Sequence, residues 1–157
     1  MKNKILFVAV IIFIIDQFIK TLAFNYLNNI TIIPSFLSFI FAKNKGAAFS
    51  ILWGNRWVII IITILILFFL IHTILKERKK IERYIKFYDV TYGLLIGGIL
   101  GNLFDRILRG YVIDYIALSI FGYSFPIFNI ADIAITSGVI FMIIYILFFE
   151  NKEKKEE

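Results

Sequence analysis

The sequence contains no cysteine and a single histidine, His72. The absence of thiols excludes disulfides, cysteine nucleophiles and thiolate metal sites. One histidine without cysteine is also too little for a typical zinc site. We therefore expect neither a bound metal nor a cofactor.

Charged residues are rare within long apolar blocks of the chain. Hydrophobic residues make up 61% and aromatic residues 18% of the 157 positions, whereas soluble domains are about half apolar. The net charge is +6, but the basic residues lie at the ends of the apolar blocks, where they orient membrane helices. The composition predicts one integral membrane domain, 1–157, without a nucleic-acid partner.

Four stretches approach the roughly 20 residues that a helix needs to cross a bilayer. They cover about residues 5–24, 57–75, 88–107 and 130–149. No small-x-small cleavage site follows the first block, and Asp16 and Lys20 interrupt its later part, so we interpret it as a retained helix. The sequence thus predicts an all-α membrane bundle of four transmembrane helices.

The distribution of lysine and arginine predicts the orientation of these helices. Eleven of them lie in the N-terminus, the connection 76–87 and the C-terminal tail, against five in the connections 25–56 and 108–129 together with the adjoining Arg106. Positive charge favours the cytoplasm. Both termini and residues 76–87 are therefore expected inside, and the other two connections outside.

The two outer segments are expected to contain extended structure. Residues 25–56 are too long for a simple connector. Residues 30–41 and 111–121 are rich in β-branched and aromatic residues, which favour strands. We expect a small β-rich layer on the outer face of the bundle.

Ionisable residues in membrane spans are costly and mark functional sites by default. Asp16 and Lys20 are spaced i, i+4, and a structural ion pair is the preferred interpretation over direct catalysis. Asn102, Asp105 and Arg106 are expected on one face of the third span. Structural support is favoured for Asp105, whereas Asn102 and Arg106 could equally contact a ligand.

Small residues form two further motifs. The glycines within residues 97–101 allow another helix to approach closely. Residues 46–48 offer a surface with almost no side chain to another backbone, and Asn44 beside them can both donate and accept hydrogen bonds. The alternative for this second motif is a tight turn before a membrane helix.

Asp114 and Asp132 are the candidate catalytic residues. Taken alone, Asp114 could be a solvent-facing strand residue, and Asp132 could stabilise the first turn of a helix. The turn-forming residues 122–126 lie between them and allow the chain to reverse, and the orientation places both on the outer side. Two neighbouring carboxylates retain one proton, so one can activate water while the other polarises a carbonyl. This is aspartic-protease chemistry.

Four blocks of the sequence carry a resemblance to a known family. They are DQFIK at 16–20, NKGAAFS at 44–50, GGILGNLFDRILRGYVIDYI at 97–116 and FNIADIAI at 128–135. In their order and spacing the chain resembles the lipoprotein signal peptidases, or signal peptidase II. The resemblance places the catalytic pair at Asp114 and Asp132. It places supporting residues at Asp16, Lys20, Asn44, Gly98, Asn102, Asp105, Arg106 and Asn129.

The resemblance also implies an activity and a location. Members of the family remove signal peptides from prolipoproteins, cutting before a cysteine that carries diacylglycerol. The expected fold is four transmembrane helices with a β-sheet cradle and a short amphipathic segment at the outer face of the bacterial cytoplasmic membrane. Lipidated prolipoproteins and membrane lipid are the implied partners, no oligomer is required, and globomycin is expected to bind the same site. Ile133 departs from the family, in which serine is common at this position.

We expect a mechanism in which the two aspartates share a proton and hold a water, with either one initially protonated. Asn44, Arg106, Asn129 and the backbone from Gly46 onward would position the substrate. Two alternatives stay open at this point. The chain could be a small transporter of an ion or solute, although its polar residues gather on one side of the membrane. It could also be a non-catalytic assembly factor, in which both aspartates would tolerate amidation.

Overall fold

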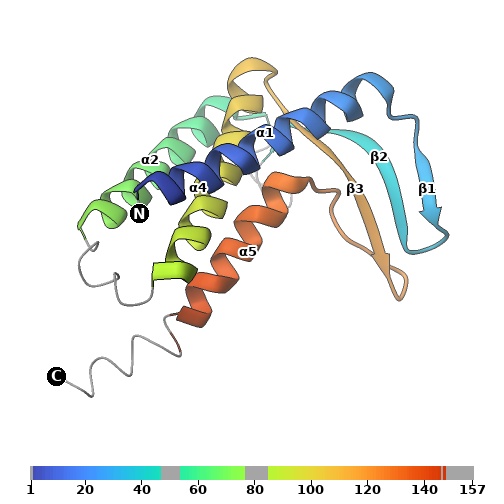
Figure 1. Ribbon diagram of the computed structural model, residues 1–157. Helices are drawn as coiled ribbons and strands as arrows, with labels where there is room; N and C mark the ends of the chain where they lie inside the picture. The colour runs from blue at the N-terminus through green and yellow to red at the C-terminus, as the bar shows by residue number, and fades with distance from the viewer. Residues whose placement is uncertain (1, 47–53, 77–84, 146, 148–157) are drawn as a thin grey trace.

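The computed structural model describes residues 2–46, 54–76, 85–145 and 147. Within them, helices and strands follow one another as α1 (Lys2–Tyr26), β1 (Ile30–Ile33), β2 (Leu37–Asn44), α2 (Arg56–Lys76), α4 (Ile85–Leu108), β3 (Val112–Ile120), β4 (Tyr123–Ser124) and α5 (Ile130–Tyr145). Each of the four predicted apolar blocks forms a helix (Figure 1). Residues 47–50, 77–84, 146 and 148–149 of the predicted segments lie outside the described residues.

The predicted extended segments form an antiparallel sheet in the order β1-β2-β3-β4. The pairing of β2 with β3 sets Ala42 opposite Asp114 and Asn44 opposite Val112. Gly122, with φ of 80°, lies in the turn that joins β3 to β4. The chain therefore reverses direction between the two candidate aspartates, as predicted.

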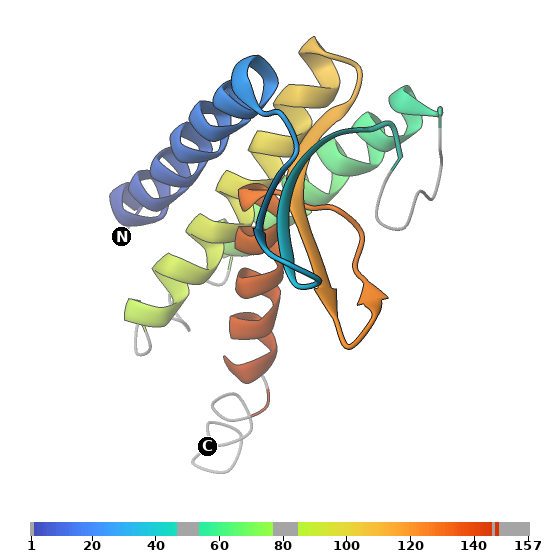
Figure 2. The same ribbon diagram turned by 90° about the vertical axis from the view of Figure 1, so that its right-hand side faces the viewer.

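The sheet lies at one end of the helices, as the two views in Figures 1 and 2 agree. The start of α1, the start of α4 and the end of α5 lie at the opposite end. The strands follow α1 and α4 in the chain, so both of these helices end at the side of the bundle where the sheet lies.

Glycines in α4 allow α1 and α5 to pack against its backbone. A Cβ atom at Gly97 would lie 2.7 Å from the carbonyl oxygen of Ala9 in α1. A Cβ atom at Gly98 would lie 2.5 Å from the carbonyl oxygen of Ala131 in α5. Both distances are shorter than a carbon–oxygen contact allows, so the predicted close approach of helices is confirmed.

The outer surface of the helices is strongly apolar. Phe7 of α1 is 65% exposed, and Phe68 and Phe69 of α2 are each 70% exposed. Among the described residues, two helices, covering Asn3–Tyr26 and Arg56–Lys76, are long and apolar enough to cross a membrane. Helix α5 is apolar but shorter in its described part. Such a surface suits hydrocarbon better than water.

Candidate active site

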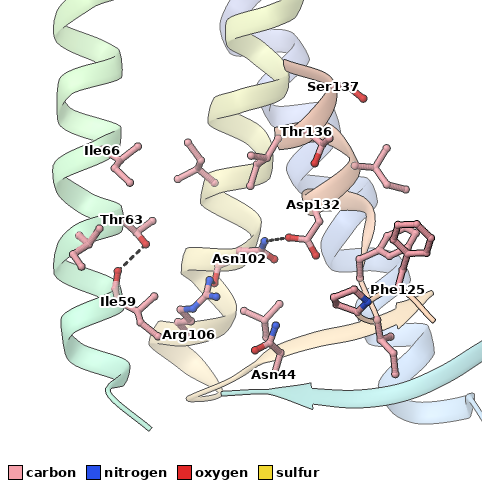
Figure 3. Close-up of a pocket in the computed structure, with 18 of the residues that line it drawn as sticks. Asn44, Ile59, Thr63, Ile66, Asn102, Arg106, Phe125, Asp132, Thr136 and Ser137 are labelled. Carbon is pink, nitrogen blue, oxygen red and sulfur yellow. Dashed lines mark hydrogen bonds between the residues drawn. The ribbon is translucent and has the colours of Figure 1, made fainter. Parts of the chain in front are cut away.

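A cavity of about 850 Å³ lies between α2, α4, α5 and the sheet (Figure 3). Isoleucines of α2, including Ile59, Ile62 and Ile66, line one wall. The polar side chains that line the cavity include Asn44, Asn102, Arg106 and Asp132. The cavity therefore combines an extended apolar wall with a compact group of hydrogen-bonding and charged groups, as binding sites commonly do.

Asp132 is fixed by the first turn of α5. The backbone N–H of Asn129 donates to Oδ2 of Asp132 at 3.1 Å, and the N–H of Asp132 donates to Oδ1 of Asn129 at 3.0 Å. This reciprocal pair is a capping box, which satisfies backbone donors that a helix start leaves free. The amide of Asn102 donates to the other carboxylate oxygen at 2.8 Å. The predicted placement of Asp132 in the first helical turn is confirmed.

Asp114 is held in β3 and is only 2% exposed. The possibility of a solvent-facing strand residue is therefore wrong, because the sheet packs this face of β3 against the helices. The Nδ2 group of Asn44 donates to its Oδ2 at 2.9 Å, and Nδ2 of Asn129 donates to its Oδ1 at 2.6 Å. The pairing of β2 with β3 brings Asn44 to this position.

Asn129 connects the two carboxyl groups, since its side chain bonds Asp114 and its backbone bonds Asp132. Each of the four carboxylate oxygens accepts a hydrogen bond from an N–H group. Burial, followed by the charge of Asp132, raises the pKa of Asp114 to about 7, although its two amide donors act against this rise. Asp114 is therefore suited to hold a proton near neutral pH.

Behind these residues lies an ion cluster, which we define as Asp16, Lys20, Asp105 and Arg109. The Lys20 ammonium lies 2.9 Å from Asp16 and 3.1 Å from Asp105, and all three side chains are fully buried. Arg109, which directly follows the last residue of α4 and is partly exposed, forms an ion pair with Asp105. The predicted pair of Asp16 with Lys20 is present and extends to α4.

The two carboxylates of the ion cluster also accept backbone hydrogen bonds. Oδ1 of Asp16 accepts from the N–H of Ala131 at 3.0 Å, at the start of α5. Oδ2 of Asp105 accepts from the N–H of Ile113 at 3.2 Å, at the start of β3. The cluster therefore holds in place the two elements that carry Asp132 and Asp114.

Arg106 lines the cavity, whereas Asp105 contacts Lys20 of α1, and Asn102 does both. The three residues predicted on one face of the helix are therefore divided between α1 and the cavity. The guanidinium of Arg106 donates to the carbonyl oxygen of Gly46 at 3.0 Å and to that of Asn102 at 3.3 Å. The N–H of Gly46 donates to Oδ1 of Asn44 at 3.0 Å. This part of the predicted 44–50 motif thus lies beside Asp114, while residues 47–50 are outside the described chain.

Three contributors to the site were not singled out from the sequence. Gln17 donates to the carbonyl oxygen of Gly101 at 3.2 Å, and the hydroxyl of Tyr115 accepts from the N–H of Ile130 at 3.3 Å. Arg109 joins the ion cluster, and its i, i+4 spacing from Asp105 was a signal that could have identified it. The sequence offered no comparable signal for Gln17 or Tyr115.

Comparisons with known proteins agree on one family. The family model described as signal peptidase (SPase) II matches residues 8–148. A lipoprotein signal peptidase of Staphylococcus haemolyticus is 42% identical over 152 residues, covering 95% of this chain and 94% of that protein. A lipoprotein signal peptidase of Staphylococcus aureus is 41% identical over 153 residues, covering 96% and 91%.

Two solved structures described as a bacterial membrane enzyme are similar in fold. One has a TM-score of 0.82 at 40% identity and covers 92% of this chain and 88% of the solved one. The other has a TM-score of 0.81 at 40% identity and covers 94% of both chains. The chain therefore belongs to the signal peptidase II family, the lipoprotein signal peptidases, which are aspartic proteases of bacterial membranes.

Proposed function

We propose that this protein removes signal peptides from diacylglyceryl-modified prolipoproteins by hydrolysing the peptide bond before the lipidated cysteine. Asp114 and Asp132 are the proposed catalytic pair. The observation that carries this proposal is the arrangement of two carboxyl groups around Asn129, with one of them lining a cavity of about 850 Å³. Membership of a peptidase family leaves no reason to favour a transporter or an assembly factor.

In the proposed mechanism Asp132 is the general base. Its carboxylate accepts N–H donors on both oxygens and lies in the first turn of α5, where the helix dipole stabilises negative charge. It takes a proton from a water molecule while the oxygen of that water attacks the scissile carbonyl carbon. Asp114 holds the other proton and donates a hydrogen bond to the carbonyl oxygen as negative charge develops there.

The second step breaks the carbon–nitrogen bond of the tetrahedral intermediate. The proton taken by Asp132 passes to the leaving amine, and Asp114 keeps its proton while the carbonyl re-forms. Arg106, Asn44 and the backbone at Gly46 are proposed to position the substrate, because they lie together beside the pair. The apolar wall formed by α2 is proposed to receive the signal peptide, and globomycin is proposed to bind the same cavity.

We further propose a single membrane domain with four spans, both termini in the cytoplasm and the site at the outer face of the bacterial cytoplasmic membrane. Two of these spans are helices that are both long and apolar enough to cross a membrane, and the 24-residue length of α4 and the apolar character of α5 support the other two. The arrangement of helix ends supports the orientation, because the sheet and the site share one end.

The test is cleavage of a diacylglyceryl-modified precursor by purified variants in detergent. We expect Asp114→Asn and Asp132→Asn each to lower kcat by about 10²- to 10⁴-fold, the usual contribution of a positioned acid or base. The control is Asp89→Asn, which neutralises a buried carboxylate in the first turns of α4, outside the proposed site. Near-normal turnover by a folded Asp114 or Asp132 variant would remove that residue from the mechanism.

A further inference from the structure

Lys20 has one contact that charge balance does not require. Its ammonium has three N–H groups and three acceptors, the third being Oδ1 of Asn102 at 2.8 Å. Within the ion cluster, Lys20 and Arg109 already balance the charges of Asp16 and Asp105. The bond to the neutral amide therefore has its main effect on Asn102.

The amide of Asn102 has a definite orientation because its two ends have different partners. Its Oδ1 accepts from Lys20 at 2.8 Å and from Asn129 at 3.2 Å, while its Nδ2 donates to Asp132 at 2.8 Å. A flipped amide would direct its N–H groups at two donors and its oxygen at a carboxylate. Asn129 alone would hold the Asn102 amide only weakly in this orientation. Its Nδ2 group is also within hydrogen-bond distance of Asp114 and of the carbonyl oxygen of Ile113.

We propose that Lys20 is a positioning residue that fixes the Asn102 amide so that it presents an N–H group, and not its oxygen, to Asp132. The inference rests on the proposed function, because it concerns the proposed general base. The bonds of Lys20 go to Asn102, Asp16 and Asp105, while its charge acts on Asp114 from a distance and lowers the pKa of that group. Lys20 acts from α1 through one amide of α4 on a residue of α5.

Several charged groups face this part of α5 from the elements packed against it. Arg106 lies on α4 and interacts electrostatically with Asp132, as Asp114 does from β3. Asp16 and Lys20 approach from α1. Of these groups, Lys20 is the one that bonds the amide oxygen of Asn102. Removing Lys20 should therefore change the pH dependence of cleavage, whereas removing another charge of the ion cluster should not.

The test compares the pH dependence of precursor cleavage in Lys20→Met, the charge-balanced Lys20→Met/Asp16→Asn variant and the control Arg109→Gln. Arg109 bonds Asp105 in the same ion cluster but has no bond to the Asn102 side chain. The free energy of a lost hydrogen bond to a charged group corresponds to a shift of about one pH unit. In both Lys20 variants we therefore expect the acidic limb of the plot of kcat against pH to move up by about one pH unit. At a pH on the acidic limb kcat should fall by about tenfold with KM unchanged, and the limb should stay in place in Arg109→Gln.

A second measurement places Asn102→Leu in the wild-type and Lys20→Met backgrounds. If Lys20 acts through Asn102, the leucine variant shifts the limb as Lys20→Met does, and the double variant shifts it no further. Additive shifts, or an unmoved limb in the Lys20 variants, would overturn the proposal. So would loss of folding in both Lys20 variants while Arg109→Gln folds, since Lys20 would then be purely structural. Normal cleavage by Asp132→Asn would instead remove Asp132 from the mechanism, and absence of precursor cleavage by the wild type would overturn the proposed function itself.

Discussion

The two sides of the cavity are built in different ways. Where α1, α4 and α5 meet, Asp16, Lys20, Asp105 and Asn129 are all 0% exposed and are joined by hydrogen bonds and ion pairs. Across the cavity, α2 buries two residues, and its long apolar side chains are mostly exposed. The first side fixes reacting groups in one geometry, whereas the second offers apolar surface that many sequences can contact.

Helix α2 is attached to the site at its first residue. The guanidinium of Arg56 donates to the carbonyl oxygen of Ile107 at 2.6 Å, near the end of α4. A cation at this position satisfies a carbonyl that the helix end leaves free. This contrast predicts that substitutions at the contact between α4 and α5 lower kcat, whereas substitutions along α2 raise KM for the precursor.

After removal of a catalytic carboxyl group, the largest expected effect is that of pH on the polar side of the cavity. The proposed mechanism needs protonated Asp114, whose pKa is raised to about 7 by burial and by the charge of Asp132. Above that pH the proton is lost, so kcat should fall by about tenfold per unit, or about 100-fold at pH 9. Cleavage rates from pH 4 to 9 measure this effect, with thermal unfolding at each pH as the check on folding. A rate that stays constant to pH 9 would contradict it.

A smaller effect is expected when the contact of α4 with α5 is widened. Gly98→Val places a side chain where the carbonyl oxygen of Ala131 lies 2.5 Å from a Cβ position. Helix α5 must move, and with it Asp132, so we expect a loss of about 1–3 kcal/mol in stability from overpacking and lower kcat. Thermal unfolding and precursor cleavage in the same detergent measure both.

The matched control for the widened contact is Leu65→Ala in α2, a side chain that is 60% exposed. It should change stability by less than about 0.5 kcal/mol, as surface substitutions do. Equal effects of the two substitutions would remove the distinction between the two sides of the cavity.

The smallest effect is expected along the apolar wall. Ile62→Ala and Ile66→Ala remove apolar groups that line the cavity from α2. We expect KM for the precursor to rise by about two- to fivefold, since about 1 kcal/mol of apolar contact is lost, while kcat is retained. Steady-state kinetics separate these two quantities. A fall in kcat without a change in KM would give α2 a part in the chemistry.

The helices and strands could be predicted from the sequence because each has a local signal. The apolar blocks exceed what a soluble core needs, and β-branched residues mark 30–41 and 111–121. The placement of Asp132 in the first turn of a helix could also be predicted, since it depends on neighbouring residues of the chain. The ends of the elements differ by a few residues from those predicted, because capping contacts and not apolar character set them.

The burial of Asp114 could not be predicted in this way. It depends on the pairing of β2 with β3 and on Asn44, which lies 70 positions away in the chain. The bond between Lys20 and Asn102 likewise spans 82 positions. The sequence identified which polar residues were costly to bury, whereas their partners across helices follow only from the packed structure.

The most direct test of the shared proton is infrared absorption of protonated carboxyl groups in wild type and in Asp114→Asn. The account predicts that the wild type loses one such band as pH rises from 6 to 8.5 and that this loss is missing in Asp114→Asn. An identical pH-dependent band in both proteins would place the proton elsewhere and contradict the proposed mechanism.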